Sequence, residues 1–171
     1  MSFPSLHVVN SELIRAAQAG DSLAMSQLLD ALVPWVGRIC GSIALDSGPD
    51  AAQEALIQVF CDLGELREPT AFRAWVRRIA TREAVRHARR DRRSEGAGTG
   101  RELPAVGDPA LVADIRSVLV DLSPEQRAIL VFRDLEGFSE DEAADLLEVA
   151  KGTVKSWLHR ARSAFQKRWS S

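Results

Sequence analysis

The sequence contains very little cysteine, with only Cys40 and Cys61 among its 171 residues. Both lie inside apolar segments, and they are too far apart for a CxxC pair. No histidine is spaced from them as in a zinc site. We therefore expect two buried free thiols rather than metal ligands.

The chain also lacks an uninterrupted apolar run of the roughly 20 residues that a membrane-spanning helix needs. Its N-terminal stretch, MSFPSLHVVNSELIRAAQAGD, has neither the basic start nor the apolar centre of a secretory signal. Apolar residues make up 46% of the sequence, which is typical of soluble globular proteins. These absences predict a soluble protein that stays in the cytoplasm.

Groups for enzymatic chemistry are equally scarce. The three histidines, His7, His87 and His159, belong to no recognisable nucleophile or metal pattern. No glycine-rich loop that could cradle a phosphate is present. We expect a protein that is not an enzyme and needs no cofactor or metal.

What the sequence does contain is strongly segregated charge, although the formal net charge is only −2. From Arg67 to Arg93, ten arginines face three acids, giving +7. From Asp108 to Glu148, eleven acids face three arginines, giving −8, and Lys151 to Trp169 carries six cations and no acid. Local fields act over about 8 Å at physiological salt, so these blocks act separately. They indicate two surfaces that bind a polyanion and one acidic surface that meets something basic or maintains solubility.

Apolar residues recur three and four positions apart through most of the chain, which predicts amphipathic helices and no strand. Four helices are expected before residue 94, around 13–17, 28–43 and 56–63 and from about Pro69 into the arginine run. Four more are expected near 111–122, from Ser123, from Ser139 and from Lys151. Ser123 and Ser139 carry the sequence form of an N-terminal capping box.

Between these groups, SEGAGTGRELPAVGD is rich in small residues and has no periodicity, as in a flexible linker. The prediction is an all-α protein of two small helical domains, residues 1–93 and 109–171, joined by a linker at 94–108.

The last two predicted helices have the form of a helix-turn-helix, with a tight connection at residues 148–150. In the second helix, Val154, Leu158, Ala161 and Phe165 form an inward stripe. The outward side chains suit phosphates and base edges. These candidate DNA-binding residues are Lys151, Thr153, Lys155, Ser156, His159, Arg160 and Arg162.

Segments in both halves of the chain resemble a known protein family. The segment DLSPEQRAILVFRDLEGFSEDEAADLLEVAKGTVKSWLHRARSAF is similar to region 4 of bacterial sigma factors of the extracytoplasmic-function (ECF) group. AAQAGDSLAMSQLLDALVPWV resembles the first helices of their region 2. PDAAQEALIQVF resembles its core-polymerase-binding helix, and TAFRAWVRRIATREAVRHARRDRR its promoter-melting helix.

The resemblance implies a promoter-specificity subunit that binds core RNA polymerase and is held inactive by an anti-sigma factor. Region 2 would dock on a coiled coil of the largest polymerase subunit and open the minus-10 element. Region 4 would bind the polymerase flap and read the minus-35 element. The implied polymerase contacts are Glu54, Ile57, Gln58 and Asp62, and the implied minus-10 contacts are Arg67, Thr70, Arg78, Arg82, Arg86 and Arg90.

The sequence departs from the family pattern in four places. Glu54-Ala55-Leu56-Ile57-Gln58 replaces Asp-Leu-Val-Gln-Glu, and Thr81-Arg82 replaces Arg-Asn. Trp157 replaces an arginine, where it could pack on a sugar, cover the core or contact a regulator, and Glu148 replaces a turn glycine. The alternative reading is a stand-alone helix-turn-helix regulator that acts without polymerase.

Overall fold

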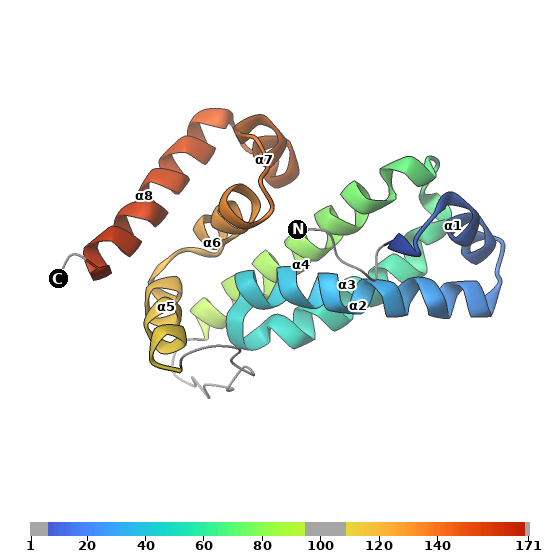
Figure 1. Ribbon diagram of the computed structural model, residues 1–171, viewed down its shortest axis with the longest axis horizontal. Coiled ribbons are helices and arrows are strands. Elements are labelled where there is room, and N and C mark those ends of the chain that lie inside the picture. Colours follow the sequence, from blue (N-terminus) through green and yellow to red (C-terminus); the bar gives the residue numbers. More distant parts are fainter. Residues whose placement is uncertain (1–6, 95–108, 170–171) are drawn as a thin grey trace.

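The computed structural model describes residues 7–94 and 109–169, and within these ranges it consists of helices and turns without a strand (Figure 1). This confirms the all-α prediction, with four α-helices on each side of the undescribed segment. The predicted linker, apart from Ser94, lies outside the described residues. The helices are α1 Ser11–Gln18, α2 Ser22–Ala44, α3 Gly48–Asp62, α4 Phe72–Arg93, α5 Pro109–Asp121, α6 Pro124–Leu130, α7 Glu140–Leu147 and α8 Lys151–Trp169.

Side-chain caps define where several of these helices begin. Asn10 accepts a hydrogen bond from the Leu13 amide at α1, and Asp21 accepts from two amides at α2. Ser123 and Ser139 form the two predicted capping boxes, with Gln126 and Glu142 as their reciprocal partners. Each box satisfies two backbone donors that the first helical turn would otherwise leave unpaired.

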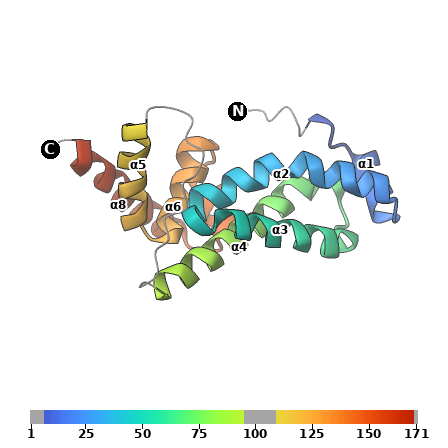
Figure 2. The same ribbon diagram turned by 90° about the horizontal axis from the view of Figure 1, so that it is seen from below.

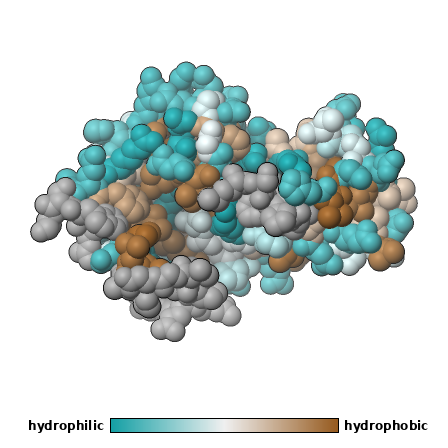
Figure 3. Space-filling model, viewed as in Figure 1, coloured by the Kyte–Doolittle hydropathy of each residue, from teal (hydrophilic) through white to brown (hydrophobic). Residues whose placement is uncertain are grey.

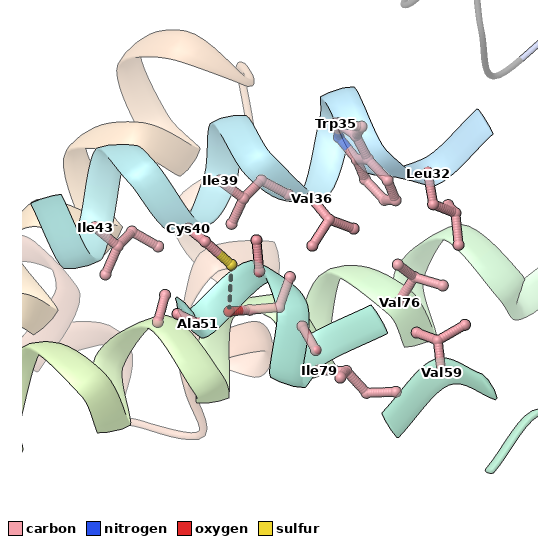
Figure 4. Packing of buried hydrophobic residues seen from close by; sticks show 14 of the residues in the cluster. Leu32, Trp35, Val36, Ile39, Cys40, Ile43, Ala51, Val59, Val76 and Ile79 are labelled. Atoms are coloured by element: carbon pink, nitrogen blue, oxygen red, sulfur yellow. Dashed lines mark hydrogen bonds between the residues drawn. The ribbon is translucent and has the colours of Figure 1, made fainter. Parts of the chain in front are cut away.

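The N-terminal core is built around α2, which packs against α1, α3 and α4. Figure 4 shows side chains of α2 meeting Val59 of α3 and Val76 and Ile79 of α4. Trp35, Val36 and Phe72 are among the largest fully buried side chains. Burial of such groups contributes roughly 1.5 to 3 kcal/mol each, so this cluster fixes the direction of α3 and α4.

Two apolar positions differ from the sequence prediction. Cys61 is exposed rather than buried, and neighbouring Phe60 is 56% exposed although it fits the apolar period. The core side of α3 is already filled by Ala51, Ala55 and Val59, so its opposite side faces outward. Cys40 is buried as expected, and its Sγ lies 3.5 Å from the Ala80 carbonyl oxygen (Figure 4).

The segment Ser22–Glu65 is long and apolar enough to cross a membrane by length and composition alone. The segment is not an uninterrupted apolar run, because charged residues such as Asp30 and Arg38 lie within it. In the folded chain 56% of the apolar window is buried among the other helices. We therefore interpret this segment, which comprises α2 and α3, as part of the core of the N-terminal half.

The C-terminal half is arranged around α6, which packs against α8 and continues into a π-helical turn, Val131–Leu135. Buried Ile129, Phe132, Ala143 and Val154 come from four successive elements and hold this half together. α7 packs on the first part of α8. This packing fixes the orientation of the basic helix.

The two halves lie against each other. α6 packs on both α2 and α4, and α7 touches α4. Figures 1 and 2 both show α6 beside these N-terminal helices, with α8 on the far side of α6. One continuous cluster of buried apolar residues includes members of both halves. The proposed domain boundary therefore separates two sequence units that are in contact in the folded chain.

Candidate nucleic-acid interface

The connection between α7 and α8 has the geometry of a helix-turn-helix. Glu148 has a φ of 54° and a ψ of 44°, a left-handed conformation. The amide of Val149 donates to the Ala144 carbonyl at 3.0 Å, which closes the end of α7. Helix ends with this conformation usually carry glycine. Glu148, which replaces the turn glycine of the family pattern, therefore occupies a position that favours glycine.

The basic helix α8 divides into two faces as its sequence predicts. Val154, Leu158 and Ala161 are buried, and Phe165 is partly buried. Six of the seven candidate minus-35 residues are exposed, and Thr153 is partly buried; the exposed six are Lys151, Lys155, Ser156, His159, Arg160 and Arg162. The surface over α7 and α8 is mostly hydrophilic (Figure 3).

Several of these cations already have acidic partners within the same half. Lys151 Nζ lies 2.8 Å from Asp141 Oδ1, and Arg162 Nη2 lies 2.6 Å from Asp134 Oδ1. The hydrogen bond to Asp141 raises the pKa of Lys151, and the one to Asp134 raises that of Arg162. Lys155 is 3.7 Å from Glu140. A phosphate would have to compete with these carboxylates, and exposed ion pairs of this kind are weak.

Trp157 is partly buried and packs against the apolar cluster. Of the three roles open from the sequence, the structure places its ring over the core. The family position occupied by arginine is therefore used here for packing.

The second candidate surface is the cationic ridge of α4, which we define as Arg78, Arg82, Arg86 and Arg90. All four are exposed, while Phe72, Val76 and Ile79 on the opposite face are buried. Successive members stand four positions apart and therefore lie on one side of the helix. Trp75 is partly buried beside Phe72, with ring centroids 6.2 Å apart.

Arg86 forms the centre of a charged cluster between α3 and α4. Its guanidinium contacts the carboxylates of both Glu54 and Glu83. His87 Nε2 lies 3.2 Å from Glu54 Oε1, and Glu83 and His87 are both buried. Desolvation would raise the pKa of Glu54, but the adjacent His87 Nε2 and the Arg86 guanidinium hold it below its ordinary value.

The sequence has no metal pattern around His87, but the fold brings two carboxylates close to it. The ligand atoms of Glu54, Glu83 and His87 lie within 4.8 Å of one another. Glu54 comes from a different helix, so no local motif announces the set. Arg86 contacts both carboxylates, and Arg82 Nε lies 3.7 Å from Glu83 Oε1, so both acids already have cationic partners in the fold.

The loop before α4 presents Arg67 and Thr70 on the surface, as expected of residues that could meet an unpaired base. It is anchored from α1, where Gln18 Nε2 donates to the carbonyls of Leu63 and Leu66 at 2.9 and 2.7 Å. This loop therefore has a fixed position at the start of the ridge.

Of the candidate polymerase contacts on α3, Ile57 is exposed, whereas Glu54, Gln58 and Asp62 are partly buried. Ile57 is 54% exposed, and Gln58 donates to Asp62 at 3.1 Å. Phe60 lies on the same exposed side as Ile57. Exposed apolar groups beside polar ones are typical of a protein-binding surface.

Sequence reasoning missed one residue that the fold places centrally. Arg77 of α4 lies between two rings, with its guanidinium carbon 5.2 Å from the Trp35 ring centre and 4.4 Å from that of Phe138. Burial lowers its pKa, and the nearby Glu136 charge opposes this. In the sequence Arg77 is one of many arginines, and Phe138 is far away along the chain.

Comparisons with known proteins agree with both halves of this description. Residues 28–94 match the Sigma-70 region 2 family, and residues 113–165 match Sigma-70 region 4. ECF RNA polymerase sigma factor SigM of Mycobacterium tuberculosis is 31% identical over 159 residues, covering 90% of this chain and 81% of the relative. The ECF RNA polymerase sigma-E factor of Escherichia coli K12 is 29% identical, covering 94% of each.

Two solved structures share the fold. CnrH, in complex with the cytosolic domain of CnrY, has a TM-score of 0.64 and 22% identity, covering 93% of this chain and 96% of CnrH. RpoE of Bartonella quintana, in complex with the anti-sigma factor NepR, has a TM-score of 0.67 and 24% identity, covering 85% and 96%. The matches to regions 2 and 4 and to SigM show that the chain belongs to the ECF family of bacterial RNA polymerase sigma factors.

Proposed function

We propose that this sigma factor directs polymerase to a defined promoter set by using α3 to bind core polymerase, α4 to engage the minus-10 element and α8 to read the minus-35 element. The observation that carries the proposal is the match of nearly the whole chain to an ECF sigma factor. The exposed face of α3 and the cationic faces of α4 and α8 fit these roles.

Within α8, the first half is the proposed reading segment. Helices in the major groove read bases mainly with their N-terminal residues. Lys155, Ser156 and His159 are exposed there, and a hollow of about 410 Å³ lies beside Lys155 and His159. In α4, Arg82, Arg86 and Arg90 are proposed to contact phosphates, and Arg67 and Thr70 to contact an exposed base.

Control by an anti-sigma factor is part of the proposal. Among proteins of the same fold, RpoE of Bartonella quintana was solved with the anti-sigma factor NepR, and CnrH was solved with the cytosolic domain of CnrY. We propose that this chain works in the cytoplasm and is likewise held by a partner protein. We also propose that it performs no catalysis itself.

The polymerase role is tested by replacing one exposed apolar residue of α3. Ile57→Arg should abolish assembly with core polymerase, because it places a charge in the centre of the proposed contact. Leu23→Arg is the matched control, since Leu23 is 67% exposed but lies on α2. Assembly is measured by co-elution with core polymerase and by transcription from selected promoters.

Equal assembly by both folded variants would contradict docking through α3. If the wild-type chain bound promoter DNA alone and failed to associate with core polymerase, the stand-alone regulator would be the better description. Circular dichroism of each variant establishes that helix content is retained.

A further inference from the structure

The side-chain amide of Gln18 joins the end of α1 to the chain that leaves α3. Its Nε2 donates to the carbonyl oxygens of Leu63 and Leu66, at 2.9 and 2.7 Å, although these residues are 45 and 48 positions away in the sequence. A glutamine amide has two N–H groups, so the two bonds use its full donor capacity. We call this pair of hydrogen bonds the Gln18 clamp.

The clamp holds both ends of one short turn. The 3-10 turn Leu63–Glu65 follows α3 and is closed by the Leu66 amide, which donates to the Leu63 carbonyl at 3.2 Å. Leu63 and Leu66 are both buried, so their side chains fix the turn on its inner side. Because the clamp binds the carbonyls of the same two residues, the backbone is fixed at both ends of the turn.

The clamp leads directly into residues 67–70, which contain the candidate base contacts and which we call the base-reading loop. The Leu66 carbonyl and the Arg67 amide belong to one planar peptide unit, so orienting the first orients the second. At the other end of the loop, α1 packs against the turn Pro69–Ala71. Figures 1 and 2 show α1 beside the connection from α3 to α4. α1 therefore supports the loop at both ends.

The end of α1 is itself held in place. Ile14 and Ala17 are buried, and α1 packs on α2. Gly20 has a φ of 91°, which lets the chain turn directly into α2. The Asp21 amide bonds back to a carbonyl of α1, and the Asp21 carboxylate caps α2. Gln18 thus extends from a fixed platform, as a side chain must if it is to set the position of a loop.

We propose that Gln18 is a positioning residue for minus-10 recognition: the clamp presets the base-reading loop in the shape that receives an unpaired base. A loop that is already ordered loses less conformational entropy when the base binds. It also discriminates better between bases, because it cannot adapt to the wrong one. This inference rests on the proposed function for Arg67 and Thr70. It gives α1 a role in DNA recognition that the proposed function does not include.

Two substitutions remove the donors in different ways. Gln18→Met keeps the length of the side chain and adds no charge. Gln18→Glu keeps the shape and replaces the amide by a carboxylate, which only accepts hydrogen bonds. Gln27→Met is the matched control, because Gln27 is exposed on α2. Circular dichroism establishes that helix content is retained, and Gln18→Glu carries the test if Gln18→Met unfolds.

The clamp is measured first in the free full-length chain by hydrogen exchange. The Leu66 and Ala71 amides close the turns at the two ends of the base-reading loop. We expect both amides to exchange several-fold faster in the two Gln18 variants than in the wild type or in Gln27→Met. Unchanged exchange would show that the Gln18 amide does not hold the turn, and it would overturn the proposal.

Base selection is measured with holoenzyme on a forked DNA, taken from a promoter that the wild-type holoenzyme transcribes. Its minus-35 element is double-stranded, and its minus-10 segment is single-stranded and varied one base at a time. We expect both Gln18 variants to lose about five-fold or more of the base preference at one position. The salt slope of binding should not change in Gln18→Met, because no cation that meets a phosphate is removed. Core assembly and binding to a minus-35 duplex alone should equal those of the wild type.

Faster exchange with unchanged base preference would overturn the positioning role. A loss of preference in Gln18→Met alone would also overturn it, since Gln18→Glu lacks the same donors. An equal loss of affinity for every base variant, or a loss of core assembly, would mean that the substitution disturbs the whole domain and not base selection. Core assembly by the wild-type chain tests the proposed function separately: its failure would refute the sigma role, whereas hydrogen exchange would still report on the clamp.

Discussion

Glu148 has a left-handed backbone conformation, which residues with a Cβ rarely adopt. A left-handed conformation costs a non-glycine residue about 1 to 2 kcal/mol. Glycine avoids this cost, but part of the gain is lost because glycine increases the conformational entropy of the unfolded chain. Glu148→Gly should therefore stabilise the protein by about 1 kcal/mol. Glu148→Ala, which removes the carboxylate but keeps the Cβ, should give no such gain. Denaturant unfolding of both variants measures the difference, and equal stabilities would refute the argument.

The two cysteines should differ sharply in reactivity. Burial, with a smaller contribution from the Glu83 charge, raises the pKa of the Cys40 thiol to about 12. The thiolate is the reactive form, so Cys40 should resist alkylation at neutral pH while exposed Cys61 reacts. Mass spectrometry after iodoacetamide treatment should find one label in the native chain and two in denaturant. Rapid double labelling of the native chain would show that the N-terminal core opens.

At the residue scale, the sequence predicted the side chains whose burial follows the helical period better than those whose surroundings depend on tertiary contacts. The inward stripe of α8 and the buried face of α4 follow from helical period alone, and the structure agrees. Cys61 and Phe60 also fit that period, yet α3 turns them outward because its core side is full. Arg77 could not be singled out, because its partners Trp35 and Phe138 are brought to it only by the tertiary fold.

Along the element α8, base reading and phosphate contact should separate from one end to the other. Lys155 lies in the N-terminal half of the helix and Lys167 in the last turns, and both are exposed. Lys155→Ala should cost about 1 to 3 kcal/mol and relax the choice of base at one promoter position. Lys167→Ala should weaken all sequences alike and lower the salt slope by about one.

The measurement uses holoenzyme binding to single-base variants of the upstream element at several salt concentrations. If Lys155→Ala weakened every variant equally and Lys167→Ala changed the preferred base, the orientation of α8 in the groove would be reversed.

The pairing of α4 with α6 should depend on pH through Glu125. Burial would raise the pKa of this carboxyl, but hydrogen bonds from backbone and from Arg89 and Ser123 lower it below its ordinary value of 4.5. A lowered carboxyl pKa means that its stabilisation is complete above the unfolded value and is lost as pH falls through the folded value.

Energy transfer between a dye on exposed Cys61 and a dye on an introduced cysteine, Gln166→Cys, should therefore decrease on acidification below about pH 4.5. Glu125→Gln should have a smaller change over that interval, because it lacks the titrating group. Circular dichroism at each pH distinguishes separation of the halves from unfolding. An identical pH profile for both chains would show that the ionisation of Glu125 does not stabilise the contact.

Helix existence and order were predictable from period, capping boxes and turn residues. Two features of the elements were not. The π-helical turn at Val131–Leu135 continues α6 without a sequence signal of its own. The charged cluster of Glu54, Glu83 and His87 depends on the approach of α3 to α4, which no local spacing encodes. The roles of these residues in binding stay predictions.

For the whole molecule, the segregated charge blocks of the sequence form ion pairs with one another in the fold. The acidic block was expected to meet a basic partner or maintain solubility. In the folded chain Glu125 and Glu136 pair with the N-terminal half, while Asp134 and Asp141 pair with α8. Segregated charge in the sequence thus becomes complementary charge in the fold. Sequence analysis located the blocks, but only the tertiary arrangement could show that they neutralise each other.

The predicted linker allows the whole-molecule arrangement to be tested without substitution. Limited proteolysis should cut first within residues 94–108, since sites rich in small residues are preferred by proteases. In the intact chain the tether keeps each half at an effective concentration of about millimolar for the other. Early cleavage within residues 53–63 would contradict the proposed domain boundary.

After the cut, docking becomes a reaction between two fragments. Contacts between domains of one chain resemble transient interfaces, so the fragments should separate at about micromolar concentration. The N-terminal fragment should then bind a mixed-sequence duplex more tightly than the uncut chain does, because Arg78 and Arg89 no longer face Glu148 and Glu125. Size-exclusion chromatography follows separation, and anisotropy of the same fractions follows DNA binding. Fragments that stay together on dilution and in high salt would mean that the contact is a permanent core, because a transient interface dissociates once the tether no longer maintains the high local concentration.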